Sequence, residues 1–222
     1  MPKYLLSRKQ LVLDVIQEYL DRNRIIKAND LINFINSRFS KTSININNRG
    51  VKEIVKQLLK KNLIIEKSKL LRNNVLINQN RKEIYDFIIN NPGIHFNKLC
   101  KKLNLSTAVI NWHLNILLKF NFIFKEKIEN FDAYFDSKIN LEFTKILHFI
   151  SRERYRKILE FFEGNNKAIS KSRLSKQLGI HRNTITKYVE KLCEIGILLK
   201  NVISNKTIYT LNVKFYKKVR SI

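Results

Sequence analysis

The chain has 222 residues, enough for one large domain or for two to three small ones. Lysine and arginine number 43 against 18 acidic residues, giving a formal net charge of +25, while 44% of the residues are hydrophobic. This composition excludes a disordered cationic tail, because enough apolar side chains are present to form a buried core. We expect a polyanion as partner, nucleic acid first and acidic membrane surface second, although AT-rich codon usage accounts for part of the lysine content.

Residues 1–78 carry the first set of helical signals. Ser7 is a suitable N-cap for a helix that runs to Leu20, and Val51, Val55 and Leu58 lie on one face of a later helix. Asn62 is expected to end that later helix, since asparagine tolerates the left-handed conformation. The run 63–65 then reads as a strand, with 70–78 as its candidate return strand.

An internal repeat covers the rest of the chain. Residues 103–117 align without a gap with residues 178–192, at an offset of 75. Both segments place apolar residues at a spacing of four and then three, which predicts one buried helix face. Both helices are expected to end at residues that accept the left-handed conformation, Asn121 and Gly196.

Helices precede each repeated segment and a hairpin follows it. We expect leading helices over 81–89 and 153–162, and short second helices over 96–103 and 171–178. The expected hairpins pair 122–125 with 131–135, and 197–200 with 207–211 across a turn at Ser204 and Asn205. A further apolar helical segment over 140–150 joins or pairs domains.

The order helix, helix, helix, hairpin is that of a winged helix-turn-helix. The predicted fold is therefore mainly α with small β-hairpins, in the α+β class, as three tandem winged helix-turn-helix domains. The predicted domains are 1–78, 79–150 and 151–222, the second including an acidic wing and the following linker helix.

The segment 91–106, continuing to Trp112 and Leu114, resembles the winged-helix repeats of archaeal transcription regulators. The resemblance covers 80–125 and 153–211, and loosely 7–78. With its bias toward lysine, isoleucine and asparagine, the whole chain is similar to methanogen activators that act upstream of promoters, such as those of archaellum operons. This resemblance implies a basal transcription initiation factor as a protein partner.

Reader positions lie beside the apolar stripe of each recognition helix, at its N-terminal end. In the third domain these are Arg182, Asn183, Thr186 and Lys187, with His181 at the helix entry. Arginine bonds guanine in two places and asparagine bonds adenine, so Arg182 and Asn183 are the best candidates for base contact. A solvated helix start is the alternative interpretation.

The corresponding positions of the other domains differ in charge. In the second domain, Thr107 and Asn111 follow the N-cap Ser106, and Trp112 is expected half-buried at a domain or subunit contact. In the first domain they are Arg49, Lys52 and Lys56, for which a plain exposed lysine face is an equal alternative.

Formal charge is concentrated in the outer domains, at +10, +3 and +12 from the first to the third. Phosphate neutralisation supplies much of the affinity of DNA-binding proteins and makes it salt-dependent. We expect this role for Lys171, Arg173, Lys200 and Lys206, and for Lys217, Lys218 and Arg220 in the tail.

The wing of the second domain departs from the basic wings of the family. Its four carboxylates are Glu126, Glu129, Asp132 and Asp136, set against Lys125 and Lys127. They and Trp112 are expected to contact another protein or a second copy of the chain. The alternative is that this wing packs onto a neighbouring basic domain.

Motifs for catalysis and metal binding are missing from the sequence. The sequence spacings typical of metal ligands, such as C-x-x-C, do not occur among His95, His113, His148, His181, Cys100 and Cys193. The five glycines form no phosphate-binding loop. We expect no enzyme activity and no cofactor, and reduced cysteines.

We expect a cytoplasmic protein with no membrane contact, since no apolar run approaches a signal or a membrane span. Two functions remain: a sequence-specific regulator that binds double-stranded DNA, and a winged-helix interaction scaffold of the transcription machinery. A monomer covering an extended site and a homodimer on a palindromic one both stay open.

Overall fold

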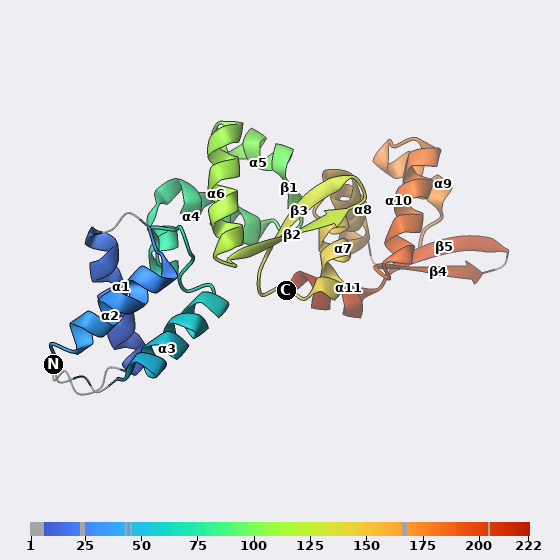
Figure 1. Cartoon of the computed structure of the whole chain (residues 1–222). Helices are drawn as coiled ribbons and strands as arrows, with labels where there is room; N and C mark the ends of the chain where they lie inside the picture. The colour runs from blue at the N-terminus through green and yellow to red at the C-terminus, as the bar shows by residue number, and fades with distance from the viewer. Residues whose placement is uncertain (1–6, 23–24, 43, 45, 166–167, 204) are drawn as a thin grey trace. The chain divides into compact units, whose positions relative to one another are not determined.

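The computed structural model describes residues 7–22, 25–42, 44, 46–165, 168–203 and 205–222. It divides into two compact units, Met1–Tyr85 with Leu105–Phe122, and Asp86–Asn104 with Ile123–Ile222. Helices dominate both units, and the strands form small antiparallel sheets (Figure 1). The α+β class expected from the sequence is therefore confirmed.

The first unit is helical in all its described elements. They are α1 (Arg8–Arg22), α2 (Ala28–Phe39), α3 (Asn48–Lys60), the 3₁₀ helix η2 (Arg72–Ile77), the start of α4 (Gln79–Asn90) and α6 (Thr107–Lys119). The Ser7 hydroxyl accepts a hydrogen bond from the Gln10 amide at 3.3 Å, which confirms the predicted N-cap. Val51, Val55 and Leu58 are buried against α1 and α2, as their spacing predicts.

The prediction of a wing in residues 1–78 is wrong. Neither 63–65 nor 70–78 forms a strand, and most of the second run is η2. Asn62 and Lys67 both have positive φ, 51° and 60°, so the chain reverses twice within a few residues. The Lys67 amide donates to the Ile26 carbonyl and the Ile26 amide to the Ser68 carbonyl, both at 2.8 Å. In the first expected strand, the Leu63 amide donates to the Leu58 carbonyl and the Leu63 carbonyl accepts from the Arg72 amide. The described backbone here therefore makes turns and bonds to the segment between α1 and α2, and forms no strand ladder.

The second unit holds the strands and the C-terminal helices. Its elements, with the end of α4, are β1 (Ile94–His95), α5 (Phe96–Leu103), β2 (Ile123–Ile128), β3 (Phe131–Asp136), α7 (Leu141–Ile150), α8 (Glu153–Gly164), α9 (Lys171–Leu178), α10 (Arg182–Glu194), β4 (Leu198–Ile203), β5 (Lys206–Leu211) and α11 (Val213–Arg220). One sheet has the order β1-β3-β2 and the other pairs β4 with β5. Both expected hairpins are confirmed; in the turn of the second, Ser204 lies outside the described residues.

The backbone reproduces the 75-residue repeat seen in the sequence. The chain enters the left-handed conformation at Asn104 and Gly179 after the second helices, and at Asn121 and Gly196 after the recognition helices. Ile94 pairs with Tyr134 in the first sheet, and Ile169 pairs with Tyr209 beside the second. These pairs also differ by 75 residues, so the repeat extends to the strand that precedes each helix pair.

Two further helices complete the second unit. α7 covers the expected segment 140–150 and begins at Asn140, whose side chain accepts a hydrogen bond from the Glu142 amide. α11 was not expected, because the sequence offered only a basic tail after β5; Asn212 caps it by accepting from the Phe215 amide. Among the described helices, none combines the length and hydropathy needed to span a bilayer.

Candidate nucleic-acid interface

Helix α10 separates its residues cleanly into a buried and an exposed face. Ile185, Val189 and Leu192 are fully buried in the core of the second unit. His181 precedes the helix, and its Nδ1 accepts a hydrogen bond from the Asn183 amide at 3.3 Å. The apolar stripe therefore fixes the helix, while its N-terminal turn faces solvent.

The predicted reader side chains lie on that exposed face. His181, Arg182, Asn183 and Lys187 are exposed and Thr186 is half-buried. Within the described residues, neither Arg182 nor Lys187 forms an ion pair. Their cationic groups are consequently available to an external partner.

Helix α9 presents its two predicted phosphate contacts differently. Arg173 is exposed, near the N-cap Ser170. The Lys171 ammonium lies 2.6 Å from a Glu190 carboxylate oxygen and 5.6 Å from the centre of the Tyr209 ring. Burial disfavours its charged form, but hydrogen bonds with Glu190 and Tyr209 outweigh this and raise the pKa of Lys171. Lys171 is therefore engaged within the domain, unlike Arg173.

The hairpin β4–β5 carries Lys200 and Lys206, both exposed. It also exposes apolar side chains that the sequence analysis did not single out: Leu199, Val202 and Ile203 are 45%, 66% and 59% exposed. Alternation along the strand would not have found all three, because Leu199 and Ile203 lie on one face and Val202 on the other, and every residue of β4 after Leu198 is exposed. The wing thus combines cations with an apolar edge.

The basic tail is folded into α11. Arg220 forms an ion pair with Glu163 of α8, and the hydrogen bond to Glu163 raises the pKa of Arg220. The Lys218 ammonium lies 5.3 Å from the Phe143 ring centre. Lys217 remains exposed.

Helix α6 has the same local design as α10 but a neutral exposed face. The Ser106 hydroxyl accepts from the Val109 amide at 3.3 Å, which confirms the predicted N-cap. Thr107 and Asn111 are exposed, and Trp112 is 55% exposed with the Arg81 guanidinium 5.5 Å from its ring centre. Burial lowers the pKa of Arg81, which donates to the Val75 carbonyl at 2.6 Å.

Helix α3 exposes Arg49, Lys52 and Lys56 along one side. In the described part of the first unit, none of the three forms an ion pair. Its N-cap is Asn47, whose side chain accepts from the Gly50 amide at 2.8 Å.

The carboxylates of the β2–β3 wing are largely engaged inside the second unit. Asp132 pairs with Lys125 at 3.0 Å, and Glu129 with Arg152 at 3.3 Å. Asp136 is buried and accepts from the Lys138 amide at 2.7 Å, while Glu126 is half-buried. The Glu129–Arg152 pair, which links the wing to the third domain, favours the alternative in which the wing packs onto a neighbouring basic domain.

No group of three or more histidine, cysteine or acidic residues could hold a metal ion in the parts of the chain that the structure describes. Cys100 and Cys193 are both free thiols there, and burial raises the pKa of Cys193.

Comparison with known proteins defines the class of domain. A family described as an N-terminal HTH domain matches residues 78–144, and an HTH domain family matches residues 154–210. The chain therefore contains two helix-turn-helix domains. Neither match extends into the residues before 78, so a helix-turn-helix domain over 1–78 stays a prediction.

The chain is also similar to an archaeal regulator. It is 31% identical over 146 residues to an uncharacterized HTH-type transcriptional regulator of Methanocaldococcus jannaschii. The match covers 64% of this chain and 37% of the relative, so the chain spans little more than a third of that protein's length.

Proposed function

We propose that this protein is a transcription regulator that binds double-stranded DNA and reads its sequence with α10. The observation that carries the proposal is the exposed N-terminal turn of α10, where Arg182 and Asn183 stand beside a fully buried apolar stripe. A recognition helix needs this combination, because the stripe fixes the position from which side chains reach base edges.

The surroundings of α10 support a phosphate grip. Arg173 on α9 and Lys200 and Lys206 on the wing are exposed cations without an ion-pair partner in the described residues. We expect them, and Arg49, Lys52 and Lys56 on α3, to neutralise phosphates. The first unit then adds affinity that is mainly electrostatic. Three DNA- or protein-contacting domains, at 1–78, 79–150 and 151–222, remain our proposal for the organisation of the chain.

Selection of bound sequences from random duplex DNA, followed by footprinting, tests the proposal. We expect an enriched motif, and the symmetry of the footprint then distinguishes a monomer from a homodimer. The double variant R182A/N183A should bind the selected duplex at least about thirtyfold more weakly, since each bidentate base contact is worth about 1–3 kcal/mol.

The matched control changes the equivalent helix of the second domain. T107A/N111A should weaken binding by less than R182A/N183A, because this face offers an uncharged threonine and asparagine where α10 offers an arginine and an asparagine. Absence of any enriched motif would contradict sequence-specific reading and favour the interaction scaffold.

We further propose that the regulator acts as an activator through a basal transcription initiation factor. The support is the sequence resemblance to methanogen activators, together with the exposed Trp112 on an uncharged helix face. In a reconstituted transcription assay, Trp112→Ala should lower activation while DNA affinity is kept. Replacement of Glu126, Glu129, Asp132 and Asp136 by neutral residues tests the wing in the same assay.

The alternative of a scaffold without sequence reading rests on the same Trp112. It predicts that T107A/N111A and Trp112→Ala weaken protein capture, whereas R182A/N183A changes nothing. The two candidates therefore differ in which recognition helix matters.

A further inference from the structure

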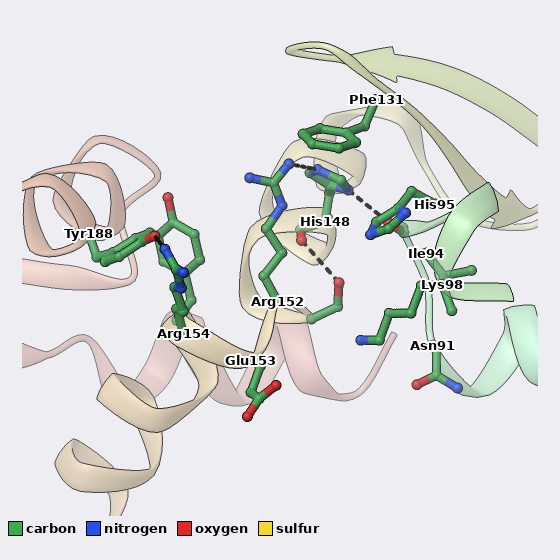
Figure 2. Close-up of a pocket in the computed structure, with 13 residues that line it drawn as sticks. Asn91, Ile94, His95, Lys98, Phe131, His148, Arg152, Glu153, Arg154 and Tyr188 are labelled. Atoms are coloured by element: carbon green, nitrogen blue, oxygen red, sulfur yellow. Dashed lines mark hydrogen bonds between the residues drawn. The ribbon is translucent and has the colours of Figure 1, made fainter. Parts of the chain in front are cut away.

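A cavity of about 490 Å³ lies within the second unit, where β1 and the turn before it meet the junction of α7 and α8. This volume is in the range of small-molecule sites, about 300–1,000 Å³. Figure 2 shows His95 and Lys98 on one side, Arg152 facing them, and Arg154 with Tyr188 beyond. Neither the helix-turn-helix matches nor the proposed DNA contacts assign a role to this cavity.

Cationic groups dominate the polar lining. Lys98 and Arg154 form no ion pair in the described parts of the chain, and the lining acid, Glu153, is already 3.7 Å from Lys157. Burial and then the nearby charge of Arg156 and Lys102 lower the pKa of Lys98, and the weaker opposing effect of Glu153 does not cancel them. The cavity is therefore short of negative charge, which a bound anion would supply.

Arg152 is held rigidly at the centre of the wall. Its guanidinium donates to Nε2 of His148 at 2.7 Å, pairs with Glu129, and lies 4.8 Å from the Phe131 ring centre. His148 is fully buried, and its Nδ1 lies 2.7 Å from the Gly93 carbonyl oxygen. His148 is thus a neutral ring that donates from Nδ1 and accepts from Arg152, so the arginine is fixed before any ligand arrives.

The lining also includes three aromatic side chains and one polar atom for which the described residues offer no hydrogen bond. Phe131, Tyr155 and Tyr188 line the cavity, and Phe131 is 39% exposed. The Nδ1 atom of His95 is buried without a hydrogen-bond partner. Buried polar atoms normally find a partner, so this nitrogen is a further group that a ligand can satisfy.

We propose that this cavity binds a small organic anion with a phosphate or carboxylate group and a flat apolar portion. The charged group contacts Lys98 and Arg154, and the apolar portion packs against Phe131 and Tyr188. Tyr188 belongs to α10, and its hydroxyl accepts from Arg154 at 3.1 Å. A ligand that binds Arg154 in place of Tyr188 breaks this hydrogen bond and so removes a contact of the recognition helix α10. This regulatory consequence rests on the proposed function, whereas binding of the ligand does not.

Calorimetric titration of the full chain with phenyl phosphate, without DNA, tests the site. We expect saturable binding at one site per chain, at least about fivefold tighter than for inorganic phosphate or phenol, which each lack one half of the recognised chemistry. Lys98→Gln and Arg154→Gln should each weaken it about tenfold. Lys214→Gln, an exposed cation on α11, should leave it unchanged. Thermal unfolding midpoints of the unliganded variants verify that they fold. If one of the two cavity variants does not fold, the other alone still tests the site.

Two calorimetric results would overturn the site. One is no saturable binding of phenyl phosphate; the other is equal binding by Lys98→Gln, Arg154→Gln and the unchanged protein. DNA affinity of Lys98→Gln measured without phenyl phosphate should be unchanged; Arg154→Gln is not used for this comparison, because it also removes the bond to Tyr188 of α10. A loss of DNA affinity by Lys98→Gln equal to its loss of phenyl phosphate affinity would assign this cation to DNA phosphates instead and also overturn the site. Because the calorimetric titration contains no DNA, its result does not depend on whether α10 reads DNA.

Discussion

The second and third domains share a backbone design and differ in what they expose. Their recognition helices, α6 and α10, bury apolar residues at matching positions and begin at the caps Ser106 and His181. Yet α10 exposes Arg182 and Lys187 where α6 exposes Thr107 and Trp112. A shared scaffold therefore does not imply a shared partner, because recognition depends on side chains that folding leaves free.

A second difference lies in the turn before each helix pair. Gly93 has φ 81°, and a Cβ atom there would lie 2.7 Å from the His148 Cα. The equivalent residue of the third domain, 75 positions on, is Ala168, which is exposed. In the second domain the backbone of α7 packs against this turn, and Gly93 and His148 both line the cavity.

The largest effect is expected from breaking this close approach. Gly93→Ala should lower the free energy of unfolding by about 2–5 kcal/mol, combining a positive φ with overpacking against backbone. Urea denaturation measures it, with Ala168→Gly as the matched control, expected to cost about 1 kcal/mol or less. Equal losses of unfolding free energy in both variants would show that the close approach of Gly93 to His148 does not contribute to stability.

The second largest expected effect is a loss of stability at low pH that is greater in the second domain than in the third. Burial lowers the pKa of His95, His113 and His148, with nearby cations, including Arg152 at His148, adding to the effect, while the Gly93 carbonyl opposes it at His148. Well above pH 6.5 these histidines are neutral in both folded and unfolded chains. Below it the unfolded chain binds protons first, so stability falls, by up to about 1.4 kcal/mol per pH unit for each histidine.

Hydrogen exchange locates that loss. Between pH 7.5 and 5.5, amides of β1 and α7 should lose protection before those of α10, which His181 caps from the surface. Simultaneous loss in α10 and α7 would show that the buried histidines do not govern the acid response.

The same chemistry predicts a pH effect on the cavity. His95 faces Lys98 and Lys101 of α5, Arg152 and the neutral His148. A bound anion favours protonated His95, so from pH 7.5 to 6 the unchanged protein should gain affinity for phenyl phosphate relative to His95→Gln; the comparison removes the effect of the second proton that the ligand itself takes up at about pH 6. An equal change in affinity for both proteins would exclude His95 from the site.

The smallest expected effect compares two lysines of the third domain. Lys206→Ala should reduce the slope of log affinity against log salt concentration by about 1, the value for one phosphate contact. Lys171→Ala should change this slope by much less, because Glu190 already neutralises Lys171. Titrations at several salt concentrations distinguish the two; equal changes in slope would show that DNA binding breaks the Lys171–Glu190 pair.

Much of the fold was predictable because it depends on local signals. Asn62, Asn121 and Gly196 all adopt positive φ as expected, since few residues tolerate that conformation at a helix end. The error in the first domain has the opposite origin. Residues 63–65 look like a strand, but Lys67 and Ser68, which follow them, bond to Ile26, a distant partner that no local pattern reveals.

The surface was less predictable for the same reason. Lys171 and Glu190, or Arg152 and Glu129, are 19 and 23 residues apart, and only folding pairs them. A count of charges therefore overstated both the free cations of α9 and the free carboxylates of the middle wing.

The most direct test of the central claim asks whether Arg182 reads a base. Once a selected duplex is known, its guanines are replaced one at a time by 7-deazaguanine, which lacks the N7 acceptor. At one position the unchanged protein should lose about tenfold in affinity, whereas Arg182→Ala should lose almost none. If Arg182→Ala loses as much as the unchanged protein at every guanine, Arg182 does not read guanine and α10 is not the reader described here.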